Sequence, residues 1–371
     1  MKHVTPSESK QADRRILLVV AFLFISPVAF AADAPATRPS PVISNITWDF
    51  DHLIRLAHGS DLWPTTWAAD DAVYAGWGDG GGFVGDSDTR GRVSIGFARI
   101  EGMPPNIVGH DVWGDHKGNF AEHQATFPGK PVGLLSMDGV LYAFVTSWWN
   151  EHGRTNPDPP EARLAWSQDA GATWTMSQWK MTRREGEFFG GTFVNFGKGY
   201  AGAMDENVYV FGSVKGRRGA ALARVNKHQL RDIEAYEFFA GAEGKPLWTK
   251  EIGRANSVFV DPEPGASDSH FSVIYDAPLK RYLATWSHDG AIGGLWVLDA
   301  PKPWGPWTVV AAYDDWGHYG KREALLWSIP TKWISADGKM MWCVFSAGRL
   351  RPSDGMLDSF NLVRMTLEVK R

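Results

Sequence analysis

The stretch Thr65–Gly82, TTWAADDAVYAGWGDGGG, contains the pattern that decides the fold. Apolar and β-favouring runs lie on both sides of Asp70-Asp71, which is a turn signal, so the stretch predicts a β-hairpin. The residue that precedes the first strand of a hairpin lies at the same end as the residue that follows the second. Asp61 and Asp79 are therefore predicted to lie close together, at the end of the hairpin away from its turn.

The same hairpin pattern recurs about every 67 residues along the chain. In each copy an apolar strand reaches a turn that contains Asp, and a second strand follows that is centred on an aromatic residue. These aromatic residues are Tyr74, Tyr142, Tyr209, Tyr282 and Trp342. A further strand is predicted after each hairpin, at residues 94–99, 163–167, 220–225, 294–298 and 361–365. One such sheet cannot bury both of its faces alone, so the five copies are expected to stack around an axis.

The repeat predicts an all-β fold, a five-bladed β-propeller with about four antiparallel strands in each blade. The 40 Gly, 19 Trp and 20 Phe are typical of many short strands joined by turns. Residues 227–239 are the best helical candidate and predict one or two helical turns at most. SQDAGATW at 167–174 matches the Asp-box, a turn whose Ser and Asp side chains cap the backbone while the Trp packs in the sheet. This Asp-box is predicted to lie at the opposite end from Asp61.

The N-terminus has the pattern of a secretory signal peptide. Arg14 and Arg15 precede an apolar run of about 15 residues, and Ala29-Phe30-Ala31 is a small-x-small cleavage site. The predicted division is a signal peptide at 1–31, a linker at 32–44 and the propeller domain at 45–371. Cleavage after Ala31 would place the mature protein in the periplasm or outside the cell. An uncleaved anchor and export by the twin-arginine route are the alternatives.

The composition bears on partners and cofactors. The formal net charge is −4 and no basic stripe is evident, so no nucleic-acid partner is expected. The chain has no second apolar segment, and the mature protein is expected to be a monomer without a membrane partner. Cys343 is the sole cysteine, so no intramolecular disulfide can form. No cofactor or metal motif is present, although Asp86-Ser-Asp88 and Asp268-Ser-His270 offer ligands that would favour Ca²⁺.

The hairpin geometry, applied to every copy, predicts that one face of the propeller collects carboxylates, imidazoles, guanidiniums and indoles. The first two copies supply Asp61, Trp63, Asp79, His123, Trp148, Trp149 and His152. The other three supply Tyr200, Arg217, His288, Asp289, Arg322 and Arg349. Loops at one end of a rigid scaffold commonly carry function, so this face is the predicted site.

This set of side chains fits carbohydrate chemistry. Indole faces stack on sugar rings, and Arg or Asp side chains bind hydroxyl, uronate or sulfate groups. Two carboxylates across a glycosidic bond act as general acid and as base or nucleophile, about 5 Å apart for retention and about 6.5–9.5 Å for inversion. The predicted pair is Asp61 and Asp79, with Asp289 as a third candidate. The glycines at 80–82 are expected to let backbone approach a ligand, although Asp79 could instead cap this turn.

Several segments resemble a family of secreted bacterial propeller domains, many of them uncharacterised. These segments are Asp61–Asp71, Gly78–Phe83, Arg92–Arg99, Phe196–Val210 and Ile329–Gly338, within a resemblance that covers roughly residues 48–370. The resemblance implies kinship with five-bladed glycan hydrolases, such as arabinan-degrading enzymes. A looser resemblance links the chain to ulvan lyase propellers, which cleave uronate polysaccharides by β-elimination. It implies that His123, His152, Tyr200 and Arg217 would supply the base, the acid and the groups that neutralise the uronate.

The sequence therefore predicts a secreted glycoside hydrolase that cleaves a polysaccharide or oligosaccharide. Trp63, Trp148 and Trp149 are the predicted glycan platforms, and His152, Arg217, His288, Arg322 and Arg349 are further substrate-binding residues. Two alternatives stay open at this point. One is a polysaccharide lyase that uses the His, Tyr and Arg set, and the other is a non-catalytic carbohydrate-binding propeller.

Overall fold

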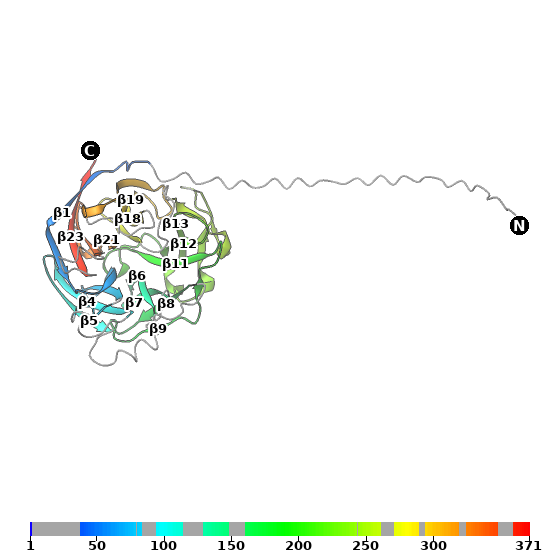
Figure 1. The fold of residues 1–371 in the computed structure, drawn as a ribbon, viewed down its shortest axis with the longest axis horizontal. Coiled ribbons are helices and arrows are strands. Elements are labelled where there is room, and N and C mark those ends of the chain that lie inside the picture. The colour runs from blue at the N-terminus through cyan, green and yellow to red at the C-terminus, as the bar shows by residue number, and fades with distance from the viewer. Residues whose placement is uncertain are drawn as a thin grey trace. The chain divides into compact units, whose positions relative to one another are not determined.

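The computed structural model describes eleven parts of the chain. They are residue 1 and residues 38–78, 80–83, 94–113, 129–147, 160–242, 244–260, 271–288, 294–318, 324–347 and 359–371. The chain divides into residues 1–32 and a compact unit, residues 33–371, which contains all of the strands (Figure 1). The described residues form antiparallel β-strands and short 3₁₀ turns, with no α-helix among them. None of their helical segments has the length and apolar character needed to cross a membrane.

The first sheet is an antiparallel meander in the order β2-β3-β4-β5. Its strands are β2 (Asp61–Trp67), β3 (Val73–Gly78), β4 (Gly96–Met103) and β5 (Asn106–Trp113). The predicted hairpin is confirmed, because β2 and β3 pair across the turn at Asp70 and Asp71. Asp61 lies opposite Gly78 in this pairing, so the start of β2 and the end of β3 share one end of the sheet.

The second sheet has the order β10-β8-β7-β6, with β9 also paired to β8. Its strands are β6 (Lys130–Met137), β7 (Val140–Thr146), β8 (Glu161–Ser167), β9 (Thr175–Met176) and β10 (Met181–Thr182). In the turn after β8, Gly171 N donates to Ser167 Oγ at 2.8 Å and Thr173 N donates to Asp169 Oδ1 at 2.9 Å. The Trp174 ring then stacks on Phe97 of the first sheet, with ring centroids 4.0 Å apart.

The third sheet combines two antiparallel meanders. The first consists of β11 (Phe188–Asn195), β12 (Asn207–Val214), β13 (Ala220–Asn226), β14 (Glu237–Phe239), β15 (Trp248–Thr249) and β16 (Ser257–Phe259). The second consists of β17 (Phe271–Asp276), β18 (Arg281–His288), β19 (Gly294–Ala300) and β20 (Thr308–Tyr313). A short parallel pairing between β11 and β17 joins them, at Val194↔Val273 and Asn195↔Ile274.

The fourth sheet brings together the two ends of the folded unit, in the order β1-β23-β22-β21. Its strands are β1 (Ile43–Leu56), β21 (Ala324–Ser328), β22 (Met340–Ala347) and β23 (Phe360–Val369). β1 comes first in the chain but pairs with β23, the last strand, from Ile43↔Val369 to Leu56↔Phe360. Figure 1 shows this as a blue strand lying beside a red one. The repeat pattern did not predict the role of β1.

The six 3₁₀ turns lie in the connections between strands. They are η1 (Lys198–Tyr200), η2 (Lys227–Gln229), η3 (Ile233–Ala235), η4 (Ile252–Arg254), η5 (Trp316–His318) and η6 (Thr331–Trp333). η2 and η3 are the one or two helical turns expected in residues 227–239. The predicted second and third strands of every copy are also confirmed as parts of β3 and β4, β7 and β8, β12 and β13, β18 and β19, and β22 and β23.

Residues 38–44, which the sequence assigned to a linker, belong at least in part to the folded unit. Val309 N donates to Arg38 O at 2.8 Å and Ser40 N donates to Val309 O at 2.8 Å, so this segment is bound to β20. Ile43 is 2% exposed and starts β1. The folded unit therefore begins before the predicted boundary at residue 45, because the segment has a β-strand edge to pair with.

Asn195 connects three strands at the centre of the unit. Its side-chain amide donates to Leu134 O of β6 at 3.2 Å and to Thr65 O of β2 at 3.4 Å. Its side-chain carbonyl accepts from Thr66 Oγ1 at 2.7 Å, and Ser136 N donates to that same hydroxyl at 2.9 Å. A buried polar network that is satisfied in this way fixes one arrangement of the strands that share it.

An ionic cluster around Asp71 stabilises the turns near the C-terminal end of β2. Lys198 of η1 and Lys332 of η6 lie 3.0 and 3.1 Å from the Asp71 carboxylate, and Trp67 Nε1 donates to it at 3.1 Å. These contacts, with Lys198 the largest contributor, lower the pKa of Asp71 to about 2. The cluster connects three turns that are far apart in the sequence.

Asp276, the last residue of β17, is a buried carboxyl group with incomplete hydrogen bonding. Its Oδ1 accepts from Leu279 N at 3.3 Å, while its Oδ2 has no hydrogen-bond partner among the described residues. Burial raises the pKa of Asp276 to about 6, and the nearby charge of Asp337 acts in the same direction. Gly338 leaves room for this carboxyl group, since a Cβ there would lie 2.5 Å from Asp276 Oδ1.

We expect Asn195→Leu to lower the free energy of unfolding by about 2–3 kcal/mol, because it leaves buried groups on β2 and β6 without partners. Denaturant unfolding would measure the change. Asn45→Ala, at an exposed position of β1, is the matched control and should change stability by less than about 0.5 kcal/mol. An Asn195→Leu variant as stable as the wild type would contradict this role for the amide.

We expect Asp276→Asn to stabilise the protein at neutral and alkaline pH. The folded pKa of Asp276 is raised to about 6, so the wild type loses stability as pH rises from the unfolded pKa of about 3.9 through 6. The asparagine resembles the protonated acid and does not titrate. The variant should exceed the wild type by on the order of 2–3 kcal/mol near pH 8 and by little near pH 3.5. Urea unfolding across this range tests the prediction, and a difference that does not vary with pH would contradict it.

Candidate functional site

One strand from each meander lines the centre of the unit. β2 contacts β6, β6 contacts β11, β11 contacts β17, β17 contacts β21, and β21 contacts β2, so these inner strands form a closed ring. The parallel register of β11 and β17 shows that these two run in the same direction. The side of the ring where the inner strands begin is called the mouth below, and Asp61 and Lys130 lie there as the first residues of β2 and β6.

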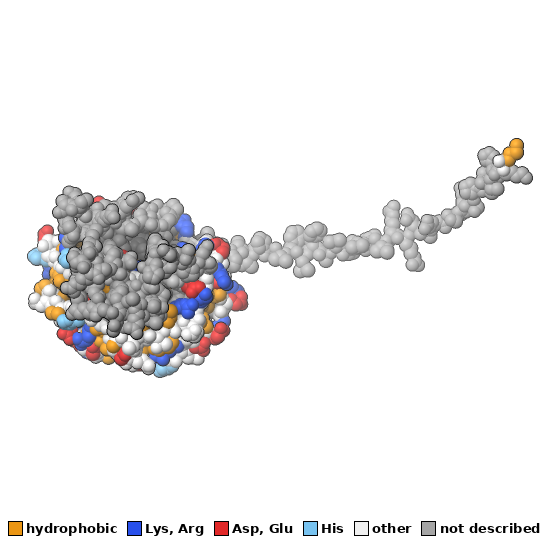
Figure 2. Space-filling view, turned by 60° about the horizontal axis from the view of Figure 1, so that its bottom comes forward, with side chains coloured by type: hydrophobic (Ala, Val, Ile, Leu, Met, Phe, Trp, Pro, Cys, Tyr) orange, Lys and Arg blue, Asp and Glu red, His pale blue; other side chains and the backbone are white. Residues whose placement is uncertain are grey.

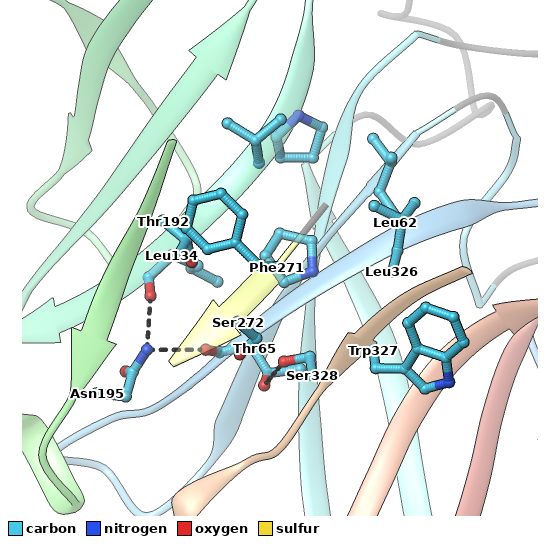
Figure 3. A pocket seen from close by; sticks show the side chains of 13 residues that line it. Leu62, Thr65, Leu134, Thr192, Asn195, Phe271, Ser272, Leu326, Trp327 and Ser328 are labelled. Carbon is cyan, nitrogen blue, oxygen red and sulfur yellow. Dashed lines mark hydrogen bonds between the residues drawn. The ribbon is translucent and has the colours of Figure 1, made fainter. Parts of the chain in front are cut away.

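The inner strands surround a cavity near the mouth (Figure 3). It has about 420 Å³ of empty space, part of which is open to solvent. Its wall is about as polar as it is apolar. The lining residues are Leu62, Pro64, Thr65, Pro131, Val132, Leu134, Thr192, Asn195, Phe271, Ser272, Leu326, Trp327 and Ser328. Only about 30 Å³ of this space admits water-sized groups, far less than the roughly 300–1,000 Å³ of a ligand pocket, so a ligand would have to lie largely outside the cavity.

The backbone around the cavity departs from regular strand geometry. The register shifts in four inner strands, at Leu62/Thr65 in β2, Pro131/Gly133 in β6, Gly190/Thr192 in β11 and Leu325/Ser328 in β21. In addition, Leu62, Trp63 and Leu326 have positive φ angles of 79°, 58° and 60°. Bulges turn side chains toward new directions, and strained non-glycine residues concentrate at functional sites. The irregularity therefore supports a site at the mouth of this ring.

Asp61 and Lys130 share the space over Gly78. A Cβ on Gly78 would lie 2.8 Å from Asp61 Oδ1, 2.8 Å from Leu62 Cδ1 and 3.2 Å from Lys130 Cδ. Lys130 is only 6% exposed, which is unusual for a lysine. Lys130 is not among the site residues predicted from the sequence. The available signal was a single lysine at the start of an otherwise uncharged strand, KPVGLLSM.

The glycine-rich segment after Gly78 packs against the protein itself. Gly82 N donates to Ser60 Oγ at 2.8 Å, and Phe83 N donates to Asp111 Oδ1 at 2.9 Å. A Cβ on Gly80 would lie 2.0 Å from Ser60 Oγ. The glycines were expected to bring backbone close to a ligand, and this is wrong for Gly80 and Gly82. Their lack of a side chain instead makes room for the side chains of Ser60 and Asp111.

Trp63 is a core residue and not a glycan platform. Its side chain is fully buried, and its Nε1 donates to Ser60 O at 3.2 Å. Its ring packs edge-on against Phe83 and Phe360, with centroids 5.7 and 5.1 Å away. Trp63 has a positive φ angle of 58° and lies at the bulge between Leu62 and Thr65.

Tyr200 lies at the turn end of the unit, away from the mouth. It ends η1, in the long connection between β11 and β12, and Ala69 of the β2–β3 turn is the nearest neighbour of the adjacent Gly199. Its hydroxyl donates to Asn207 O at 2.8 Å, and burial raises its pKa well above the usual value. The catalytic role suggested for Tyr200 is therefore corrected, because β2 separates that turn from Asp61 by about 20 Å of strand.

Arg217 follows β12 at the mouth end but is engaged by its own meander. Its Nη1 donates to Asn256 Oδ1 at 2.6 Å and to the carbonyl of Ala255. Tyr200 lies at the other end of the unit, so Tyr200 and Arg217 of the lyase alternative do not come together. Figure 2 shows acidic and basic side chains interspersed over the described part of one face, without a patch of one sign.

The other predicted site residues lie outside the described residues or at their limit. Those outside are Asp79, His123, Trp148, Trp149, His152, Asp289, Arg322 and Arg349. His288 is the last residue of β18, in register with Gly294. A further carboxylate that the sequence analysis did not select, Glu187, directly precedes β11 at the mouth. In the part of the chain that the structure describes, no group of three or more His, Cys, Asp or Glu side chains could hold a metal ion.

Solved structures of GH43 enzymes are similar to this chain. CoXyl43, a β-xylosidase/α-arabinofuranosidase from a compost microbial metagenome crystallised with xylotriose, has a TM-score of 0.52 and 12% identity over 87% of this chain and 98% of its own. A GH43_1 enzyme from Xanthomonas citri has a TM-score of 0.51 and 11% identity over 86% and 94%. Its complex with xylotriose has a TM-score of 0.50 and 11% identity over 91% and 93%. At such low identity the similarity establishes the fold alone, which is a β-propeller.

No curated protein sequence matches this chain. A protein-family model does match, and it covers residues 110–322, more than half of the chain. Its description is "Domain of unknown function (DUF4185)". The protein therefore belongs to the DUF4185 family.

Proposed function

We propose that this protein is a glycoside hydrolase that cleaves a polysaccharide or oligosaccharide at the mouth of a five-bladed β-propeller. Asp61 and Asp79 would be the two catalytic carboxylates. The observation that carries the proposal is the register of β2 and β3, in which Asp61 lies opposite Gly78 beside the cavity. The closed ring of β2, β6, β11, β17 and β21 supports the count of five blades.

The chain on both sides of Asp79 is fixed next to Asp61. Gly78 pairs with Asp61. Gly80 packs on Ser60, which directly precedes Asp61 in the chain. Asp79 itself lies outside the described residues, and the proposal rests on the placement of its two neighbours in the chain. Glycoside cleavage requires two carboxylates on opposite sides of one glycosidic bond, and Asp61 and Asp79 are proposed for these positions.

Two such carboxylates can divide the chemistry of glycoside cleavage. One, as the carboxylic acid, donates its proton to the glycosidic oxygen while the bond to the anomeric carbon breaks. The other, as the carboxylate, either removes a proton from an attacking water or attacks the anomeric carbon itself. The distance between the two carboxylates decides whether the configuration at the anomeric carbon is inverted or retained. NMR of the product anomer would show which of the two occurs.

The substrate class is supported by the fold and the type of cavity. Two of the GH43 structures described above were solved with xylotriose bound, which concerns those enzymes only. In this chain the strands that end or begin at the mouth lead into segments with further polar and aromatic residues. We propose Asp289 and His123 as supporting catalytic groups. The proposed contacts to the glycan are Trp148, Trp149, His152, His288, Arg322 and Arg349.

Secretion is part of the proposal. Residues 1–31 would be a signal peptide cleaved after Ala31, and the mature protein would act as a monomer in the periplasm or outside the cell. Polysaccharides of cell walls and of the environment are accessible there.

The decisive experiment is a screen of the purified protein against neutral and acidic glycans. Hydrolysis should produce new reducing ends without a product that absorbs in the near ultraviolet. An absorbing, unsaturated product would show β-elimination and refute the hydrolase. Binding to a glycan without any cleavage would instead indicate a carbohydrate-binding propeller.

We expect Asp61→Asn and Asp79→Asn each to lower the hydrolytic rate by at least about a hundredfold, because each removes one half of the acid–base chemistry. The thermal midpoint of each variant should remain close to that of the wild type. Asp51→Asn, at an exposed position of β1, is the matched control and should retain full activity. Full activity in either of the first two variants would remove that residue from the mechanism.

A further inference from the structure

The floor of the cavity carries a pair of hydroxyl groups. Thr65 lies past the middle of β2, and Ser328 is the last residue of β21, so both lie deeper in the ring than the residues at the start of these strands. Their hydroxyl oxygens are 2.6 Å apart, and the two residues are only 5% and 4% exposed. Figure 3 shows this hydroxyl pair among the residues that line the cavity.

One proton of this pair has no acceptor among the described residues. Each hydroxyl group carries one donor proton. One of the two protons lies between the oxygens, and the hydroxyl that accepts it must direct its own proton elsewhere. In the part of the chain that the structure describes, neither Thr65 Oγ1 nor Ser328 Oγ has a further hydrogen-bond partner. Buried polar groups of folded proteins are paired, so the remaining proton indicates an acceptor inside the cavity.

The cavity wall nearer the mouth is largely apolar. Leu62, Pro131 and Phe271 line the cavity at or next to the start of β2, β6 and β17. They therefore lie nearer the mouth than the hydroxyl pair. None of the described residues that line the cavity is charged. A group that enters from the mouth thus passes apolar side chains before it reaches the hydroxyl groups of the floor.

The size of the cavity admits a substituent of a sugar but not the sugar ring itself. About 30 Å³ of the space admits water-sized groups. Each such group needs roughly 10–15 Å³, so the space holds about two non-hydrogen atoms. The group that fits has an apolar first atom and a hydroxyl group as its second atom. In a carbohydrate, the exocyclic hydroxymethyl group, CH₂OH, has this form.

We propose that the cavity is a subsite for the exocyclic hydroxymethyl group of a neutral sugar residue. This inference rests on the proposed glycan substrate and narrows it to sugars that carry this group. The hydroxymethyl oxygen accepts the remaining proton of the Thr65–Ser328 pair, while the methylene carbon contacts the apolar wall. A xylopyranose ring lacks the group and would leave the hydroxyl pair to water. A uronate would bring a carboxylate into a cavity without a charged side chain, which is costly.

The test compares the binding of methyl glycosides that differ only in this group, measured by NMR titration of the purified protein. The first pair is methyl β-D-galactopyranoside and methyl α-L-arabinopyranoside, and the second is methyl β-D-glucopyranoside and methyl β-D-xylopyranoside. For furanose rings, methyl α-L-arabinofuranoside is compared with the corresponding methyl L-threofuranoside. We expect a glycoside with the hydroxymethyl group to bind at least about tenfold more tightly than its partner, because a site that hydrogen-bonds a hydroxyl group rejects the analogue without it.

A double variant, Thr65→Val with Ser328→Ala, removes both hydroxyl groups with little change of volume. It should lose the preference, and it should bind the deoxy analogue, in which a methyl group replaces the hydroxymethyl group, at least as tightly as the hydroxymethyl sugar. Ser257→Ala is the matched control. Ser257 is also buried, but its hydroxyl donates to Arg218 O at 2.7 Å and it does not line the cavity. This control should keep the wild-type preference.

Three outcomes would overturn the inference. In the wild type these are equal or tighter binding of the glycosides that lack the hydroxymethyl group, and the absence of binding by all six glycosides. In the double variant it is an unchanged preference for the hydroxymethyl group, which would show that the hydroxyl pair does not recognise it. The wild-type comparison needs no variant to fold.

These binding measurements are separate from any cleavage. A hydroxymethyl preference in a protein that hydrolyses no glycan would refute the hydrolase and leave the subsite in place. Hydrolysis of a xylan or of a uronate chain, without a hydroxymethyl preference, would support the hydrolase and refute the subsite.

Discussion

The pairing of β1 with β23 is the constraint on which the rest of the structure depends. It joins the first strand of the folded unit to the last over nearly the whole length of β23, and it completes the sheet that contains β21 and β22. β1 ends at Leu56, and β2 begins five residues later at Asp61. The pairing of β1 with β23 therefore also fixes the position at which β2, and with it Asp61, begins. Non-local pairing of this kind costs loop-closure entropy, which the buried faces of the sheets must offset.

The two ends of the ring use acidic side chains in different ways. At the turn end, carboxylates stabilise connections. Asp70 accepts from the Tyr74 hydroxyl at 3.1 Å, and Asp205 accepts from the Tyr209 hydroxyl at 2.7 Å. Both are Asp–Tyr pairs four residues apart, so in these two copies the Asp and the aromatic residue of the sequence pattern bind each other. At the mouth, by contrast, Asp61 begins a strand beside a bulged and strained backbone.

Much of the fold could be predicted because it rests on local signals. The hairpin around Asp70 and the aromatic second strands follow from alternation and turn residues, and they are present in the structure. β1 could not be predicted, since its partner lies more than 300 residues away and its own pattern is irregular. Tyr200 was misplaced because the connection from β11 to β12 is longer than a hairpin turn, which shifted the assumed first strand of that copy. The burial of Trp63 depends on a positive φ angle that sequence alternation does not reveal.

The charged side chains are distributed unequally between the two ends of the ring. A carboxylate whose pKa is lowered to about 2 by two cations, as in Asp71, stays ionised under all ordinary conditions and cannot donate a proton. Glycoside cleavage needs one group that donates a proton and one that does not, so the two carboxylates must lie in unequal electrostatic surroundings. A cation that lies nearer to one of two neighbouring carboxylates provides such an inequality, because it acts more strongly on the nearer one. Lys130, buried at the start of β6, is the one Lys or Arg in the inner strands β2, β6, β11, β17 and β21, whereas the paired lysines at the turn end hold connections together.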